Sequence, residues 1–494
     1  MSELTPARTR VAPSPTGDPH VGTAYMALFD LAWARRTGGQ FVLRIEDTDR
    51  ARLVEGSEQQ VFDSLKWLGL GYDEGPDVGG AHGPYRQSER LETYRPFVDK
   101  LIEDGHAYYC WCSTDRLAEL RAQQQASKQP VTGYDRLCHG KTREERAELP
   151  GFTDKPVVRM LVPDDIELTF EDIIRGQVRA PRPDDQVILK ADGFPTYHLA
   201  VVVDDHLMGI TTVVRGEEWI SSTPKHVQLY KWLDLPMPQF AHMPLLRNVD
   251  KSKISKRKNP AARLLWFREQ GYLPEALRNF LQLLAYPPVV EEDGTEREVV
   301  GFEEFVAGFD WAKISTVGPI FDVKKLDWLN GVYIRSLDAD ELAERIIEHQ
   351  LSTGAWASVD DRTRDRLRRA TPLVQERMTL LGDAVPALDF LFVGDDQLVH
   401  DPESVGKLKD DAPQVLDGAL AALEGLSEWT HEAIQAALRE ALVEGLGLKP
   451  KFAFAPVRVG VTGRQVSPPL FESMELLGRD SSLARLRVLR ARLG

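Results

Sequence analysis

The chain has 494 residues, of which 42% are hydrophobic and 28% charged, and its formal net charge is −15. These values are ordinary for a soluble globular protein, and the length allows several domains. No apolar run approaches the roughly 18 residues of a membrane helix, the first residues lack a secretory signal pattern, and three cysteines argue against a disulfide framework. We therefore expect a cytoplasmic protein without a membrane partner.

The acidic net charge does not exclude a nucleic-acid partner, because binding depends on a local basic surface. Residues 251–258 carry five cations, and residues 479–494 carry five arginines. Such runs are more often solvated surface charges. They are compatible with RNA binding but do not prove it.

The beginning of the chain predicts a strand, a turn, a helix and a second strand. Residues 8–12 are short and partly apolar, residues 13–19 have turn composition, and residues 21–36 have helical apolar spacing. A glycine pair then ends the helix, and residues 41–45 form the second strand. This unit predicts a parallel sheet covered by helices.

Further strand candidates follow at 186–189, 198–203 and 211–214. Residues 81–185 lie between the strand–helix–strand unit and these later candidates. They are rich in Gln, Asp, Arg and Pro, with a helical segment near 115–125. We interpret this stretch as a domain inserted between two halves of a sheet. Beyond about residue 331 the strand signals fade, and amphipathic patterns with several Ser, Thr or Asp starts predict helices at 342–349, 362–378, 416–423 and 431–442.

The turn at residues 13–22, PSPTGDPHVG, precedes a helix N-terminus, where N–H groups and the helix dipole favour phosphate. Gly22 would let a base or ribose pack on the backbone, and His20 can donate a hydrogen bond to a phosphate oxygen. Taken alone, a histidine in such a loop would more often only cap the helix.

A second motif is Lys253-Ile254-Ser255-Lys256-Arg257. Two lysines around a serine on a loop suit nucleotidyl transfer, which needs positive charge around the transferred group; a solvated basic loop explains the run equally well. No Walker phosphate loop occurs in the chain. Together, and in this order, the two motifs resemble the HIGH and KMSKS signatures of class I aminoacyl-tRNA synthetases.

Longer stretches narrow the resemblance to bacterial-type glutamyl-tRNA synthetases over essentially the whole chain; they are residues 10–17, 44–50, 83–88, 195–200, 216–219 and 318–322. This resemblance implies that the protein uses ATP with Mg²⁺, and that its other substrates are L-glutamate and tRNA(Glu). Whether it also acts on tRNA(Gln) is left open, and we expect a monomer. It implies an α/β Rossmann-like catalytic domain with a parallel sheet, split by an inserted α+β domain and followed by an all-α C-terminal anticodon-binding region. The expected domains are 1–80 with 186–225 (catalytic), 81–185 (binding the tRNA acceptor end), 226–330 (contacting the stem and carrying the KISKR loop) and 331–494 (helical).

The family's amino-acid site maps onto Arg10, Ala12, Ser14, Glu46, Tyr197 and Arg215, all of which are present. Glu46 suits the ammonium of glutamate, and each arginine can pair with a carboxylate. Glutamine would turn an amide NH₂ toward a guanidinium, which has no acceptor. A charged hydrogen bond is worth about 1.5–3 kcal/mol, so this mismatch would discriminate by tens to hundreds of fold.

The resemblance also implies an ATP site, formed by His20, Gly22, Glu218, Trp219, Leu245, Leu246, Lys253, Ser255 and Lys256. The expected catalytic residues are His20, Lys253 and Lys256, because they would offset the charge that develops when the glutamate α-carboxylate attacks the α-phosphorus. In the C-terminal region, Arg377 matches an anticodon-region position and could read a base edge, although a surface ion pair explains it nearly as well.

Two possible metal clusters stand out. The first is residues 204–206, Asp-Asp-His, which follow an apolar segment. We favour a structural turn over a metal site for these residues. Cys110, Cys112, Cys138 and His139 are similar to the zinc site of some family members, in which the second pair is Cys-x-His. Here that pair is adjacent, and neighbouring side chains diverge, whereas zinc needs four convergent ligands. Zinc is therefore not favoured, and no metal ligand is assigned.

Two alternatives to a glutamate enzyme remain open. Glutaminyl-tRNA synthetase has a similar catalytic core, but its C-terminal part is a β-barrel and a neutral amide does not suit two arginines. A catalytically inactive tRNA-binding homologue should have lost some of the key residues, yet Arg10, His20, Glu46, Arg215 and Lys256 are all present.

Overall fold

The structure is a computed structural model and describes residues 4–127, 133–255 and 259–494. The chain forms two compact units. The first comprises residues 1–266 and 277–323, and the second comprises residues 267–276 and 324–494. Among the helices that the structure describes, none has the length and hydropathy of a membrane span.

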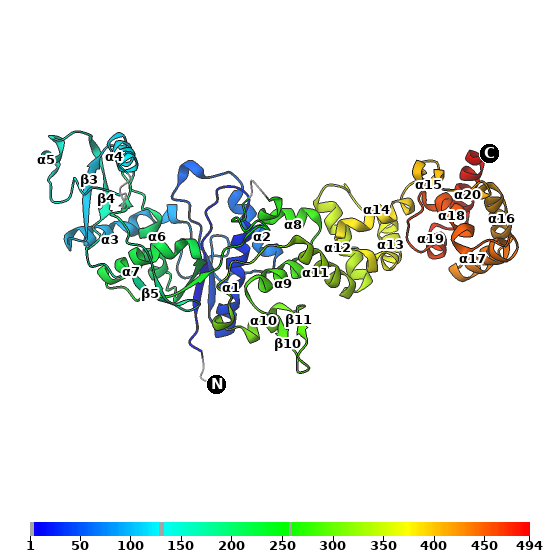
Figure 1. Cartoon of the computed structure of the whole chain (residues 1–494), viewed down its shortest axis with the longest axis horizontal. Helices are drawn as coiled ribbons and strands as arrows, with labels where there is room; N and C mark the ends of the chain where they lie inside the picture. Colours follow the sequence, from blue (N-terminus) through cyan, green and yellow to red (C-terminus); the bar gives the residue numbers. More distant parts are fainter. Residues whose placement is uncertain (1–3, 128–132, 256–258) are drawn as a thin grey trace. The chain divides into compact units, whose positions relative to one another are not determined.

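The first unit contains parallel strands (Figure 1). Those at 8–11, 40–43 and 212–216 were predicted, and the one at 239–243 was not. These strands form two pairs, β1 (Arg8–Val11) with β2 (Gln40–Leu43), and β8 (Thr212–Gly216) with β9 (Gln239–Met243). β1 also lies against β8. Every residue of β1 and β8 is buried, so Arg10 and Arg215 are held inside the protein.

Helix α1 (Val21–Thr37) packs against β1, β2 and β8. It is buried on most sides, as expected for a helix with few polar positions. Gly38 ends it in the left-handed conformation, with φ of 67°, which confirms the predicted stop. The carboxyl ends of β1 and β8 lie near the N-terminus of α1, which is where ligands bind in parallel α/β sheets.

The stretch between the two strand pairs has both helices and strands, which confirms the predicted α+β character. Its strands β3, β4 and β7 form an antiparallel sheet in that order, and β5 and β6 form a separate hairpin. The elements are α3 (Leu91–Glu103), β3 (Ala107–Cys112), α4 (Thr114–Ala126), α5 (Arg143–Ala147), β4 (Phe152–Met160), β5 (Thr169–Asp172), β6 (Gly176–Arg179) and β7 (Val187–Leu189). The predicted strand at 186–189 thus pairs with β4, outside the parallel pairs.

The strand predicted at 198–203 is wrong, because these residues lie in helix α6 (Tyr197–Leu207). A short apolar run that is buried on all sides has no periodicity to distinguish a strand from a helix. The other elements of this unit are α2 (Ser57–Trp67), α7 (Thr223–Trp232), β10 (Val289–Val290), β11 (Glu296–Arg297) and α10 (Phe302–Gly308). Helices α8 (Leu264–Gln270) and α9 (Pro274–Ala285) each contain residues of both units.

The second unit is all-helical in its described residues, as predicted. Its helices are α11 (Val323–Ser336), α12 (Ala339–Ser352), α13 (Asp361–Ala370), α14 (Ala384–Leu388), α15 (Pro402–Gly406), α16 (Ala412–Glu424), α17 (His431–Leu438), α18 (Pro450–Thr462), α19 (Leu470–Leu477) and α20 (Arg479–Leu493). The helix predicted at 362–378 ends early, at Ala370, and short 3₁₀ turns follow. Pro372 explains the end, because proline cannot continue the hydrogen-bond ladder.

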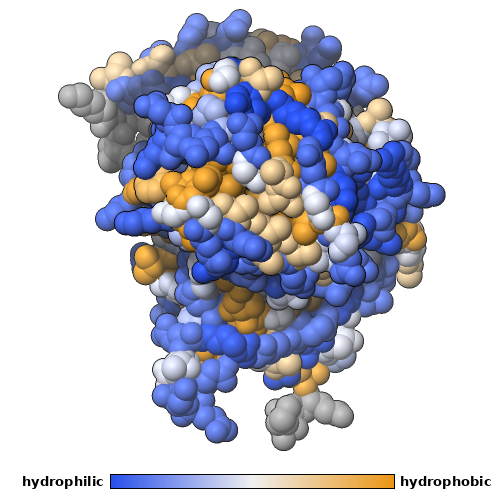
Figure 2. Space-filling view, turned by 90° about the vertical axis from the view of Figure 1, so that its right-hand side faces the viewer, coloured by the Kyte–Doolittle hydropathy of each residue, from blue (hydrophilic) through white to orange (hydrophobic). Residues whose placement is uncertain are grey.

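The helices of the second unit bury their apolar sides in one core that includes Leu342, Leu367, Leu416 and Leu486. Figure 2 shows one face of the molecule, where a hydrophobic area lies among predominantly hydrophilic side chains. Amphipathic helices that turn their apolar sides inward produce such a mainly polar surface.

Candidate functional site

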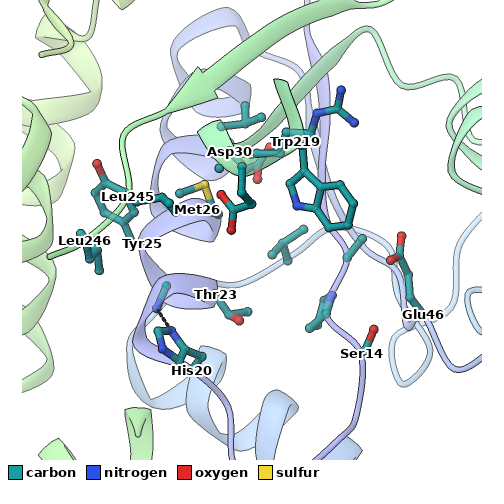
Figure 3. A pocket seen from close by; sticks show the side chains of 18 of the residues that line it. Ser14, His20, Thr23, Tyr25, Met26, Asp30, Glu46, Trp219, Leu245 and Leu246 are labelled. Carbon is teal, nitrogen blue, oxygen red and sulfur yellow. Dashed lines mark hydrogen bonds between the residues drawn. The ribbon is translucent and has the colours of Figure 1, made fainter. Parts of the chain in front are cut away.

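A cavity of about 390 Å³ lies at the carboxyl ends of β1 and β8, beside the start of α1. All six residues expected to contact glutamate line it: Arg10, Ala12, Ser14, Glu46, Tyr197 and Arg215. Several residues expected to contact ATP line it as well: His20, Gly22, Glu218, Trp219, Leu245, Leu246 and Lys253 (Figure 3). Two stretches of sequence that are far apart therefore meet in one cavity. Which ligand each side chain contacts stays a prediction.

Two other predicted residues, Ser255 and Arg377, do not line the cavity. A third, Lys256, lies outside the described residues. Arg377 is exposed in the second unit, in a 3₁₀ turn, and its Nη1 donates to the carbonyl of Ser467 at 3.4 Å. Its contact with a base stays a prediction.

His20 caps helix α1, because its Nδ1 accepts a hydrogen bond from the backbone N–H of Gly22 at 2.9 Å (Figure 3). A neutral imidazole whose Nδ1 accepts carries its proton on Nε2. The capping role that the sequence left open is therefore present, and it leaves an N–H on the opposite side of the ring as a hydrogen-bond donor.

Asp205, near the end of α6, joins two buried arginines. Its Oδ1 lies 3.0 Å from Nε of Arg10 and 2.6 Å from Nη1 of Arg44. Burial alone would raise the pKa of Asp205, but the two guanidiniums outweigh it and lower that pKa. The carboxylate thus stays ionised and fixes Arg10 at the cavity wall.

The neighbouring Asp204 is an anchor of the same kind. It is fully buried and accepts hydrogen bonds from Gln87, Arg90 and Tyr94, at 2.9, 2.7 and 2.8 Å. The turn predicted at 204–206 is therefore wrong: these residues complete a helix whose two carboxylates hold buried donors. The sequence alone does not reveal these hydrogen bonds, because the donors lie more than a hundred residues away from Asp204 in the chain.

Glu46 and Asp30 are two acids that line the cavity. Glu46 accepts from Nη2 of Arg44 at 3.2 Å, and burial raises its pKa although Arg44 and Arg10 oppose the shift. Asp30 was not predicted; it is fully buried in α1, and neither carboxylate oxygen has a hydrogen-bond partner among the residues that the structure describes. Burial raises the pKa of Asp30 well above its usual value. The sequence signal that could have identified Asp30 is an acidic residue within an otherwise apolar helical segment.

Arg215 differs from the other cavity arginines in its partners. Its guanidinium contacts His242, His226 and Thr223 at 3.0, 2.9 and 2.8 Å, whereas Arg10 and Arg44 each pair with a carboxylate. Among the described residues it takes part in no ion pair with an aspartate or glutamate within 4.0 Å. Sequence analysis did not identify either histidine.

At the other side of the cavity, Lys253 is exposed and its Nζ lies 3.2 Å from Oε1 of Glu218. Trp219 packs on Tyr197, with ring centroids 4.2 Å apart. A residue predicted to bind glutamate and a residue predicted to bind ATP thus contact each other as an aromatic pair.

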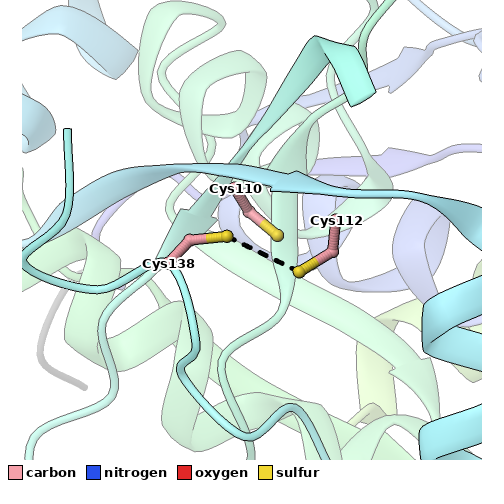
Figure 4. Close-up of side chains that lie close together, drawn as sticks. All are labelled: Cys110, Cys112 and Cys138. Carbon is pink, nitrogen blue, oxygen red and sulfur yellow. Dashed lines mark hydrogen bonds between the residues drawn. The ribbon is translucent and has the colours of Figure 1, made fainter. Parts of the chain in front are cut away.

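Cys110, Cys112 and Cys138 come together in the insertion (Figure 4). Their sulfur atoms lie within 4.8 Å of one another, and the Tyr134 hydroxyl is 3.4 and 3.3 Å from the sulfurs of Cys110 and Cys112. His139 is exposed and packs its ring edge-on against Tyr108. It is not part of this cluster, as the divergence of adjacent side chains predicts.

These residues fit a zinc ion, since structural zinc sites hold the metal with four converging ligands, several of them thiolates. Nη atoms of Arg116 and Arg146 lie 3.6 and 3.5 Å from the sulfur of Cys112. In the described part of the chain this is the one group of three or more His, Cys, Asp or Glu with such convergence; residues 204–206 do not form one.

Comparisons with known proteins place these features in one context. Residues 6–328 match the model of the class I tRNA synthetases (E and Q), catalytic domain, and residues 341–490 match an anticodon binding domain. A glutamate--tRNA ligase of Cutibacterium acnes is 65% identical over 100% of the chain and 99% of its own length. One from Acidothermus cellulolyticus is 68% identical, covering 97% and 94%.

A solved structure gives the same result. The crystal structure of a glutamate tRNA ligase from Elizabethkingia meningosepticum in complex with its amino acid superimposes with a TM-score of 0.85, at 30% identity, and covers 99% of this chain and 100% of its own. The likeness extends over both the α/β and the helical region.

Proposed function

The chain belongs to the class I tRNA synthetases for glutamate and glutamine, as a glutamate--tRNA ligase, and we propose that the cavity between β1, β8 and α1 is its active site. Full-length identity of 65–68% to glutamate--tRNA ligases and an all-helical anticodon region disfavour the two alternatives. The residue roles below are part of the proposal.

The observation that carries it is the buried guanidinium of Arg215, whose hydrogen-bond partners in the described part of the chain are all uncharged. A buried charge without a counterion is costly, so a ligand carboxylate is the natural partner. The α-carboxylate of glutamate loses its charge as it reacts, whereas the side-chain carboxylate keeps it. Arg215 therefore suits the side-chain carboxylate, and Glu46 suits the ammonium.

The nucleotide would lie on the other side of the cavity. ATP, entering as its magnesium complex, would pack near Gly22, Leu245 and Leu246, with its phosphates toward His20 and Lys253. The α-carboxylate of glutamate attacks the α-phosphorus, the bond to the bridging oxygen breaks, and pyrophosphate leaves. Donors at His20 and Lys253, together with the ammonium of Lys256, would offset the developing charge.

A ribose hydroxyl of the terminal adenosine of tRNA(Glu) then attacks the activated carbonyl, and AMP leaves. The insertion at 81–185 would hold the acceptor end, residues 226–330 would contact the stem, and residues 331–494 would bind the anticodon, with Arg377 near a base. Charging of tRNA(Gln) is an additional possibility within the same chemistry. We further propose that the enzyme acts as a monomer in the cytoplasm.

The zinc-fitting cluster has a structural place in this proposal. Cys110, Cys112, Cys138 and Tyr134 would hold the ion and fasten the loop at 134–138 to strand β3. The cluster lies outside the cavity lining, so the ion would supply no catalytic chemistry.

Competition between labelled glutamate and glutamine tests the active-site assignment. In tRNA(Glu) aminoacylation, Arg215→Gln should raise KM for glutamate at least about tenfold, since a charged hydrogen bond is lost. The matched control is Arg95→Gln, which breaks an exposed ion pair with Asp99 and an exposed hydrogen bond to Tyr109. An Arg215→Gln enzyme with unchanged KM and selectivity would remove this cavity as the glutamate site.

A further inference from the structure

Arg215 is held by uncharged acceptors on two sides. Its Nε donates to Nε2 of His242 at 3.0 Å, and its Nη1 donates to Nδ1 of His226 at 2.9 Å. Both imidazoles are buried, with 0% and 1% of their surface exposed, and Arg215 itself is 5% exposed. Water therefore contributes little to the environment of this guanidinium.

The hydrogen bonds assign the proton on each ring, because a guanidinium donates and never accepts. Since Nε2 of His242 accepts from Arg215, its proton is on Nδ1, which donates to Oδ2 of Asp172 at 2.6 Å. Since Nδ1 of His226 accepts, its proton is on Nε2, which donates to Nδ1 of His198 at 3.0 Å. Asp172 thus fixes the tautomer of His242 that Arg215 requires.

Both rings are neutral in the folded protein. Burial lowers the pKa of His226 well below its usual value and the pKa of His242 to about 4, although Asp172 opposes the second shift. The positive charge of Arg215 is therefore not compensated by its direct partners. This contrasts with Arg10 and Arg44, which share the carboxylate of Asp205.

We propose that His226 and His242 are positioning residues that determine amino-acid specificity: they orient Arg215 by hydrogen bonds while leaving its charge for the side-chain carboxylate of glutamate. This rests on the proposed function, in which Arg215 faces that carboxylate. An aspartate or glutamate at either position would orient Arg215 equally well but would neutralise it. The pocket would then lose its preference for an anionic side chain over the neutral amide of glutamine.

Two substitutions that differ only in charge test this inference. His226→Asn keeps a neutral oxygen near the position of Nδ1, and His226→Asp places a carboxylate oxygen there. The ratio of kcat/KM for glutamate over glutamine is measured in tRNA(Glu) aminoacylation, with thermal unfolding as a check on folding. We expect His226→Asn to keep this ratio within about threefold and His226→Asp to lower it at least about tenfold, mainly through KM for glutamate.

A third variant keeps the test decisive if His226→Asp does not fold. His226→Leu removes the acceptor, so it should raise KM for glutamate at least about tenfold relative to His226→Asn, with kcat little changed. The inference is overturned if His226→Asp retains the wild-type ratio, if His226→Asn lowers the ratio as much as His226→Asp does, or if a folded His226→Leu enzyme behaves like His226→Asn.

Arg215→Gln separates this inference from the proposed function. If that variant keeps the selectivity for glutamate, the assignment of the cavity is wrong. If Arg215→Gln loses selectivity while His226→Asp keeps it, the cavity assignment stands and the role of the histidines is wrong.

Discussion

Oδ1 of Asp205 lies 3.0 Å from Nε of Arg10, although 194 residues separate them in the chain. The same oxygen also binds Arg44 at 2.6 Å. One buried carboxylate on α6 therefore holds an arginine on β1 and another beyond β2. This contact fixes the wall of the cavity at which the amino acid is expected to bind.

Asp205→Asn should destabilise the protein by about 3–5 kcal/mol, because it leaves the buried guanidinium of Arg10 without its counterion. Urea unfolding measures the change. Asp99→Asn is the matched control, since it breaks an exposed pair with Arg95 and should cost less than about 1 kcal/mol. Equal effects of the two substitutions would show that the buried pair has no special weight.

His20→Asn separates capping from catalysis. Asparagine is a good N-cap residue, so stability should be retained while the imidazole donor is lost, and kcat should fall by about 10²–10³-fold. His20→Ala should lose the cap as well, at a further cost of about 0.5–2 kcal/mol in unfolding free energy. Full activity of His20→Asn would limit His20 to its structural role.

Acid should weaken the fold through His242. Its pKa is about 4 in the folded protein and about 6.5 when unfolded. The unfolded state therefore binds more protons between these values, so this contribution is fully present above pH 6.5 and is lost as pH falls toward 4. About 2 kcal/mol should be lost by pH 5.

Urea unfolding at pH 7 and pH 5 checks this. His242→Gln keeps an acceptor for Arg215 without a titratable ring, so its stability should depend less on pH in this interval. An identical pH dependence in the variant and the wild type would contradict the assignment.

The thiol cluster should bind about one zinc ion per chain, measured by elemental analysis of protein purified without chelators. Cys112→Ser should lose the metal, because a thiolate ligand is removed. His139→Ala should retain it, since that ring lies outside the cluster. Absence of zinc from the wild type, or its loss from His139→Ala, would refute this binding set.

Features that are encoded locally could be predicted from the sequence. The strand–helix–strand start follows from apolar spacing and a glycine stop, and α4 and α12 follow from capping residues next to periodic segments. Residues 198–203 could not be assigned, because a fully apolar run fits a buried helix and a buried strand equally.

The same distinction between locally encoded and distant features applies to the residues of the cavity. Contiguous motifs identified the residues from Arg10 to Gly22, but nothing in the sequence links Asp205 to Arg10 or His242 to Arg215. These pairs arise only when strands far apart in the chain lie side by side. Pairing between distant segments, and the charge balance that it creates, has no signature in a single sequence.

Aminoacylation with labelled glutamate, using purified tRNA(Glu) and tRNA(Gln), tests the central claim most directly. We expect ATP-dependent formation of glutamyl-tRNA(Glu), and charging of tRNA(Gln) as well would define a non-discriminating enzyme. Failure to charge either tRNA with glutamate would contradict the assignment of this chain as a glutamate--tRNA ligase.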